Sequence, residues 1–275
     1  DYLKAMAVFG NPYKMTDERR ADWADGLGLR PYDRQECLFY VGDVGAFDDL
    51  GRKMARSVAE TMTRAGVSFG ILGEREISDG NDVLALGEKG LAASLAERNV
   101  GLMNGLGVKN VVTLSPHAFH AMKNRYPLHG ATFRVFHYTQ VLQGFVDRIS
   151  GNRAVKSAVT FHDPCYLGRW NGEYAAPRNI LRAAHGVRPV EMERSLNNAL
   201  CCGGGGGNFY TDMLGTGPDL SARARIREAL AAGADTIAVA CPQCYRMLSD
   251  AVKDEGAAGR IRVCEVTEVL AGVCV

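Results

Sequence analysis

The 275-residue sequence lacks a long hydrophobic run, and no stretch approaches the ~18 apolar residues of a membrane-spanning helix. It also has little net charge, +1 from 32 basic and 31 acidic residues, so no overall field attracts nucleic acid or an anionic membrane. The opening residues 1–4 contain neither an initiator Met nor the apolar core of a secretory signal. We therefore expect a cytoplasmic chain that is a processed or excised part of something longer, without a nucleic-acid partner.

Apolar residues make up 47% of the chain and charged residues 23%, which is typical of a globular protein and excludes a disordered tail. Glycine is abundant, at 32 residues against a usual share of ~7%. Seven of the eight cysteines lie beyond residue 160, whereas a disulfide scaffold is shorter and spreads its cysteines evenly. We expect reduced thiols that serve a metal or catalysis.

Short apolar runs alternate with helical patterns along the whole chain. We predict strands at Cys37–Val41, Ser68–Leu72, Asn110–Leu114, Thr132–Phe136, Ala158–His162, Pro189–Met192, Thr236–Ala240 and Ile261–Val263. We predict helices at Asp48–Ala65, Val83–Leu106, Tyr138–Ile149, Asp219–Ala232 and Gln243–Lys253. Most strands are continuous β-branched runs, which suits strands covered on both faces. The alternation predicts an α/β fold with short, largely parallel sheets flanked by helices.

An internal repeat divides the chain. The segment Gly107–Ala118 resembles Gly233–Cys244, because each has a glycine, a short strand and then an X-Pro-X-X helix start. Two more pairs follow in the same order upstream: Ser78-Asp79-Gly80 with Cys201-Cys202-Gly203, and Val41-Gly42-Asp43 with Asp163-Pro164-Cys165. We predict an N-terminal extension over residues 1–35, a first lobe over 36–150 and a second over 151–275, joined by an exposed linker near 151–157. The extension is expected to pack on the first lobe or on a partner.

The second half carries the spacing C-x35-C-C-x38-C-x2-C. Its first and fourth cysteines each follow a predicted strand, and the carboxyl ends of parallel strands share one edge of a sheet. Cys241-Pro242 has the form of a helix start, where the helix dipole lowers a thiol pKa and favours the metal-binding thiolate. The predicted metal ligands are Cys165, Cys201, Cys202, Cys241 and Cys244.

Five consecutive glycines, Gly203–Gly207, follow the cysteine pair. Their conformational entropy cost is explained if the backbone must pass close to a bulky anion, with successive N–H groups facing sulfide or thiolate. We therefore predict that Gly203 and Gly204 contact the cofactor. Five soft ligands exceed the four of tetrahedral zinc, which favours an iron–sulfur cluster. Zinc, or five buried structural cysteines beside a flexible loop, are the alternatives.

These strings, together with His162–Arg169 and Leu200–Gly203, resemble the cysteine-rich CCG domain over about residues 36–270. That domain occurs in the B-type and D-type subunits of heterodisulfide reductase and in related iron–sulfur proteins of glycolate, lactate, glycerol 3-phosphate and electron-transfer-flavoprotein oxidation. The resemblance implies a [4Fe–4S] cluster, possibly of the noncubane type, on the five cysteines named above. The corresponding first-half positions hold no thiol, so that lobe is expected to bind no cluster: Asp43, Ser78, Asp79, Ser115 and Ala118.

The resemblance further implies an oxidoreductase subunit that relays electrons between a flavoprotein dehydrogenase or electron-transfer flavoprotein and a ferredoxin-like or quinone-reducing partner. Such a complex could hold the chain peripherally at the inner face of a membrane. One alternative is the catalytic disulfide-reducing subunit of a heterodisulfide reductase-like complex, for which two complete cysteine motifs are expected. A zinc-bearing scaffold subunit is the second.

Several other residues could have either of two roles. His117 and His120 could share a metal or belong to the core, and His162 could tune the cluster or be structural. Cys37, Cys264 and Cys274 are expected to be structural thiols. Arg169 and Trp170 could form a docking face or cover the cluster. Further arginines, Arg178, Arg182, Arg223, Arg225 and Arg227, are expected on solvated helix faces.

Overall fold

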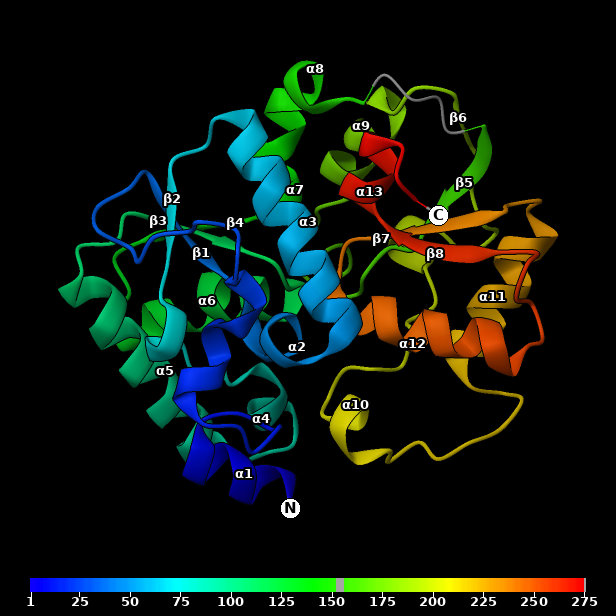
Figure 1. Ribbon diagram of the computed structural model, residues 1–275. Coiled ribbons are helices and arrows are strands. Elements are labelled where there is room, and N and C mark those ends of the chain that lie inside the picture. The colour runs from blue at the N-terminus through cyan, green and yellow to red at the C-terminus, as the bar shows by residue number, and fades with distance from the viewer. Residues whose placement is uncertain (152–155, 275) are drawn as a thin grey trace. The chain divides into compact units, whose positions relative to one another are not determined.

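The computed structural model describes residues 1–151 and 156–274, so the centre of the expected linker lies outside the described residues. The chain divides into two units, Asp1–Tyr138 and Thr139–Val275. Each unit contains its own four-stranded sheet with helices packed around it (Figure 1).

Both sheets are parallel and have the same strand order. The first is ordered β2-β1-β3-β4 and the second β6-β5-β7-β8. The strands are β1 (Cys37–Tyr40), β2 (Phe69–Ile71), β3 (Asn110–Thr113), β4 (Arg134–His137), β5 (Ser157–Phe161), β6 (Val187–Pro189), β7 (Thr236–Val239) and β8 (Arg262–Glu265). The predicted α/β fold with two repeated lobes is confirmed.

Helices connect the strands of each unit. In the first unit they are α1 (Tyr2–Phe9), η1 (Asp17–Ala24), α2 (Gly42–Phe47), α3 (Asp49–Ala65), η2 (Gly73–Arg75), α4 (Asn81–Ala85), α5 (Lys89–Gly105), α6 (Pro116–Asn124) and η3 (Tyr126–His129). α7 (Tyr138–Leu142) begins at the boundary. The second unit contains η4 (Gln143–Phe145), α8 (Val146–Ile149), α9 (Ala175–Ala183), η5 (Leu196–Asn198), α10 (Asn208–Thr211), α11 (Ser221–Ala231), α12 (Pro242–Asp254) and α13 (Val266–Ala271). The η elements are 3₁₀ helices.

Local sequence explains where these helices begin and end. Asp48 caps α3 by accepting hydrogen bonds from the backbone N–H groups of Leu50 and Gly51, both at 3.0 Å. Gly66, with φ +78°, ends the helix in the left-handed conformation that glycine adopts without strain. The predicted helix over 83–106 is wrong in one respect, because it is two helices. Gly87, with φ +93°, lies between α4 and α5 and interrupts the helix there.

The N-terminal segment is built into the first unit. Met6 of α1 is buried in one hydrophobic cluster with Ile77, Val83 and Leu95. η1 contributes Trp23, whose ring meets Phe39 of β1 edge to face. Residues 1–35 therefore supply core side chains to the first unit.

The expectation that all thiols are reduced is wrong for two of them. Cys264 of β8 and Cys274 form a disulfide, since the chain after α13 returns to within a Cα–Cα distance of 5.9 Å. The remaining six cysteines are free thiols. In the part of the chain that the structure describes, no helix combines the length and apolar character that crossing a membrane requires.

Candidate metal centre

Sulfur atoms gather beyond the carboxyl ends of β5 and β7. Cys241 is the N-cap of α12, where its Sγ accepts a hydrogen bond from the Cys244 backbone N–H at 3.5 Å and Pro242 is the first helical residue. Cys165 lies in the turn after β5, while Cys201 and Cys202 lie in the loop between η5 and α10. Three separate connections thus deliver the five predicted ligands to one end of the sheet.

The cysteines contact one another in pairs. Cys165 Sγ lies 3.7 Å from Cys201 Sγ, and Cys244 Sγ lies 3.3 Å from Cys202 Sγ. All five are free thiols. Cys202, Cys241 and Cys244 are buried, whereas Cys165 and Cys201 are partly exposed. The group therefore has one side closed by protein and one side near solvent.

The contacts make proton loss unequal among the thiols. Contacts with Cys165 and Cys202, together with a hydrogen bond from the Gly203 N–H at 3.3 Å, lower the pKa of Cys201. The contact with Cys201 raises the pKa of Cys165, and burial raises it further. Binding of a cation to this group would displace the shared protons, because the thiolate is the ligand.

The glycine loop passes close to the sulfur atoms. Gly203 has φ +82°, in the left-handed region. A Cβ placed on Gly204 would lie 3.7 Å from Cys202 Sγ and 3.0 Å from Met247 Cγ, which is crowded. A side chain would therefore displace its neighbours beside the cysteine pair.

His162 follows β5 directly, and its backbone N–H extends the sheet by donating to Ala238 O at 3.0 Å. Its side chain is fully buried, and neither ring nitrogen has a hydrogen-bond partner among the described residues. Burial, reinforced by the Arg225 charge, lowers the pKa of His162 to about 4, so the ring is neutral at pH 7. A ring nitrogen and the Sγ atoms of Cys202 and Cys244 all lie within 4.8 Å of one another.

This donor set fits an iron–sulfur cluster. It consists of five thiols gathered at one edge of the sheet, with one neutral imidazole beside them. Soft sulfur ligands select zinc or iron–sulfur clusters over magnesium or calcium, and five exceed the four of a tetrahedral zinc site.

The first unit has oxygen atoms where the second has sulfur. Phe39 of β1 pairs with Val112, as Phe161 of β5 pairs with Ala238, so the two strand ends correspond. Asp43 therefore takes the place of Cys165. Ser115 caps α6 by accepting from the His117 N–H at 3.2 Å, just as Cys241 caps α12.

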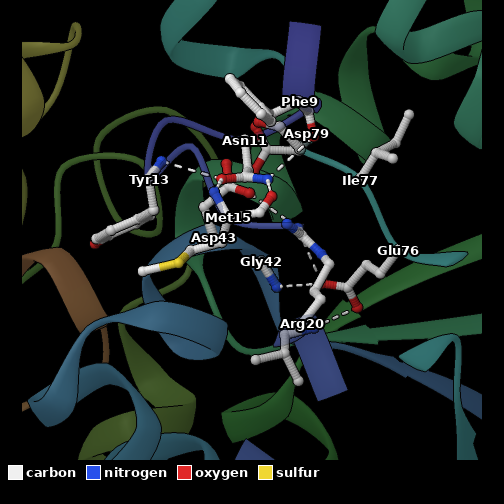
Figure 2. Close-up of polar contacts among 12 residues, drawn as sticks. Phe9, Asn11, Tyr13, Met15, Arg20, Gly42, Asp43, Glu76, Ile77 and Asp79 are labelled. Atoms are coloured by element: carbon white, nitrogen blue, oxygen red, sulfur yellow. Dashed lines mark hydrogen bonds and ion pairs between the residues drawn. The ribbon is translucent and has the colours of Figure 1, made fainter. Parts of the chain in front are cut away.

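An arginine of the N-terminal segment pairs with Asp43, one of these oxygen-bearing residues (Figure 2). Arg20 of η1 lies 2.9 Å from Asp43 Oδ1 and 3.5 Å from Glu76 Oε1, and its side chain is 2% exposed. Glu76 also accepts from the backbone N–H groups of Val41 at 3.1 Å and Gly42 at 2.8 Å. Burial lowers the pKa of Arg20, but the carboxylates outweigh it and hold the pKa above its ordinary value. We had not predicted this network from the sequence, because Arg20 stands in the charged run Asp-Glu-Arg-Arg, which has the composition of a solvated surface.

The candidate histidine pair of the first unit has protein partners instead. His117 Nδ1 lies 3.5 Å from Asp82 Oδ1, and His120 Nδ1 lies 3.2 Å from the side-chain nitrogen of Asn124. Within residues 1–151 and 156–274, no group of three or more metal-ligating side chains includes either histidine. Both are buried core residues.

Two arginines, one of them expected on a solvated helix face, form polar contacts within the second unit. Arg169 donates to the carbonyls of Asn197 and Ala199 and so holds the loop that leads to Cys201. Arg178 pairs with Asp163 at 2.6 Å and with Glu191. Trp170, which is 61% exposed, stacks on Tyr166 with ring centroids 6.2 Å apart.

Arg225 is 1% exposed, although we had expected it on a solvated helix face. Its guanidinium donates to the Arg194 carbonyl at 2.7 Å and to Glu228. The same side chain supplies the positive charge that acts on His162.

A family model described as a cysteine-rich domain, CCG, matches residues 159–249, which include all five cysteines. The second unit contains a CCG cysteine-rich domain. The resemblance inferred from the sequence is therefore confirmed for this unit.

Similarity to known proteins extends beyond the CCG match. The chain is 37% identical to the probable iron–sulfur-binding oxidoreductase FadF of Bacillus subtilis, over 95% of this chain and 39% of that protein. It is 34% identical to the EtfAB:quinone oxidoreductase of Syntrophomonas wolfei, over 94% of this chain and 38% of that protein. It is 32% identical to a subunit of the dihydromethanophenazine:CoB–CoM heterodisulfide reductase of Methanosarcina barkeri, over 90% of this chain and 62% of that protein. The chain thus spans about two fifths of the length of the first two relatives.

Proposed function

We propose that the CCG unit holds an iron–sulfur cluster of the [4Fe–4S] kind on Cys165, Cys201, Cys202, Cys241 and Cys244, and that the chain is the electron-relay part of an oxidoreductase. The observation that carries this proposal is the convergence of the five free thiols, with Sγ atoms 3.3 Å and 3.7 Å apart. Such a cluster accepts and donates single electrons. The similarity to a probable iron–sulfur-binding oxidoreductase agrees with this chemistry.

The chain's own residues would set the properties of the site. The Gly203 N–H favours the thiolate form of Cys201, and the start of α12 directs the Cys244 N–H at Cys241 Sγ. The buried side, formed by Cys202 and Cys244, excludes water. A redox partner would approach from the side where Cys165 is partly exposed, since electron transfer weakens with distance.

The proposed partners are a flavoprotein on one side and a ferredoxin-like or quinone-reducing protein on the other. Two observations support them: a relative named EtfAB:quinone oxidoreductase and another named probable membrane-anchored ferredoxin, 36% identical over 93% of this chain. Binding to such partners would place the chain peripherally at the inner face of a membrane. An electron paramagnetic resonance (EPR) signal that forms when reduced flavoprotein is added would support the relay.

The second candidate function is disulfide reduction, which the heterodisulfide reductase relative favours. The first unit argues against a complete reductase, because its corresponding positions carry Asp43, Asp79 and two serines. An EPR signal of the oxidised protein that changes on addition of a thiol substrate would support this candidate over the relay.

The cluster itself is tested by metal analysis of protein purified under dinitrogen. We expect about four iron and four sulfide per chain, whereas about one zinc would support the scaffold alternative. Cys202→Ser should lower the iron content severalfold, because it removes a sulfur that lies 3.3 Å from Cys244 Sγ. Cys37→Ser is the matched control, since Cys37 is buried in the first unit and contacts the Ser68 carbonyl at 3.7 Å. Unchanged iron in Cys202→Ser would remove Cys202 from the ligand set.

A further inference from the structure

His162 is a fully buried polar side chain of the second unit. A neutral imidazole has one N–H donor and one acceptor nitrogen, and burial without a partner costs free energy. Among the described residues neither nitrogen forms a hydrogen bond. The polar groups beside it that can act as ligands are Cys202 Sγ and Cys244 Sγ, within 4.8 Å. The ring therefore lies against the cysteine group.

The first unit shows what this strand-end position looks like when no cluster is expected. Tyr40, which follows Phe39, corresponds to His162, which follows Phe161. Tyr40 is also fully buried, but its hydroxyl donates to the Ile77 carbonyl at 2.5 Å. In the first unit, a backbone carbonyl therefore accepts a hydrogen bond from the buried side chain at this position. In the second unit, the buried imidazole has no such partner among the described residues and lies beside the thiols.

We propose that the His162 ring N–H donates a hydrogen bond to a cysteine sulfur of the cluster, at Cys202 or Cys244, and so raises the cluster's reduction potential. This inference rests on the proposed iron–sulfur function. A donor to sulfur stabilises the extra negative charge of the reduced cluster, and such hydrogen bonds are one of the main determinants of potential. Direct iron ligation by the ring is a different arrangement, and the test below separates the two.

The number of cysteines available as ligands favours donation over ligation. Arg225, whose Nε and Nη2 have no hydrogen-bond partner among the described residues, supplies a positive charge close to His162. Asp163 and Cys201 supply negative charge. All four irons of a [4Fe–4S] cluster can be held by the five cysteines, which leaves the imidazole free to act as a hydrogen-bond donor.

The test compares His162→Phe, which removes the donor, with His162→Gln, which keeps one. His185→Gln, an exposed histidine of the same unit, is the control. Iron and sulfide are counted first, so that absence of a cluster in the unsubstituted protein counts against the proposed function and not against this inference. Reduction potentials are then measured by EPR-monitored titration of the anaerobic protein.

We expect His162→Phe to retain the cluster and to shift its potential to more negative values. A tenfold fall in the reduced-to-oxidised ratio corresponds to about 59 mV for one electron. His162→Gln should recover part of the shift, and His185→Gln should show none. Equal potentials for His162→Phe and the unsubstituted protein would overturn the proposal.

A measurement on unsubstituted protein keeps the proposal testable if the variants lose the cluster. Pulsed EPR of protein with unlabelled or ¹⁵N-labelled histidine should reveal a weak histidine-nitrogen coupling, as expected across a hydrogen bond. No coupling, or the strong coupling of an iron-bound nitrogen, would overturn the proposal.

Discussion

The two units use one architecture to place different chemistry at the ends of their strands. Each has the same parallel strand order and a capped helix after its third strand along the chain. At that edge the CCG unit gathers thiols and an imidazole that has no hydrogen-bond partner among the described residues, whereas the first unit gathers carboxylates around Arg20. The same strand order and capped helix thus accompany two different sets of side chains at the strand ends.

The two units differ in which groups bind the buried polar side chains at the strand ends. In the first unit the charge of Arg20 is matched from within the chain by Asp43 and Glu76. In the second unit the thiols hydrogen-bond to one another, and among the described residues His162 is left with its polar atoms unmatched. An unmatched buried set is the expected state of a site that is completed by a bound group.

The largest effect should follow from Arg20→Met, which leaves two carboxylates buried without their cation. Breaking a buried ion pair by removing one partner costs about 3–5 kcal/mol of unfolding free energy. Chemical denaturation, with hydrogen exchange of β1 peptides to assign the loss to the first unit, measures it. Arg19→Met is the control, because the Arg19 side chain is 59% exposed and pairs with Asp22 on the same helix. Equal stabilities for the two variants would mean that the arginine does not replace the missing cluster energetically.

A middle-sized effect distinguishes the two helix caps. Ser115→Ala removes the hydroxyl that accepts from the His117 N–H and should cost about 1 kcal/mol of unfolding free energy. Cys241→Ser keeps an acceptor at the corresponding cap of α12, so the cap survives while a sulfur ligand is lost. We expect iron content to fall in Cys241→Ser and to stay constant in Ser115→Ala. If both variants kept their iron, Cys241 would cap α12 without being a metal ligand.

Seven of the eight strands appear within one or two residues of their predicted bounds, because most of them contain a short apolar run. The prediction placed β6 too late: the strand covers Val187–Pro189, and the Val190 N–H still donates to the Val159 carbonyl at 2.9 Å. The cysteine group was also predictable, since ligand spacing after strands is a local signal. Arg20 was not, because its role depends on a contact with Asp43, 23 residues away, that no periodic pattern records. The lack of a hydrogen-bond partner for His162 among the described residues was not predictable either. It depends on whether the neighbouring polar groups are already bound to other residues.

The smallest effect concerns Asp79, the counterpart of Cys202. Burial, opposed by a hydrogen bond from the Asn81 N–H at 2.8 Å and reinforced by the charges of Asp43 and Asp82, raises the pKa of Asp79 to about 7, while the His117 charge lowers it. Between the unfolded value near 4 and this value, the folded state holds a proton that the unfolded state releases, so rising pH lowers stability.

Asp79→Asn keeps the acceptor oxygen and removes this titration. The variant and the unsubstituted protein should therefore be nearly equal in stability at pH 4. The variant should gain stability relative to the unsubstituted protein as pH rises to about 7, and the difference should stay constant above that. Hydrogen exchange of first-unit peptides across this range measures it, with the exposed Asp33→Asn as control. A difference that is independent of pH would mean that Asp79 is ionised throughout. The oxygen-lined site would then hold one more negative charge beside Arg20 than we infer.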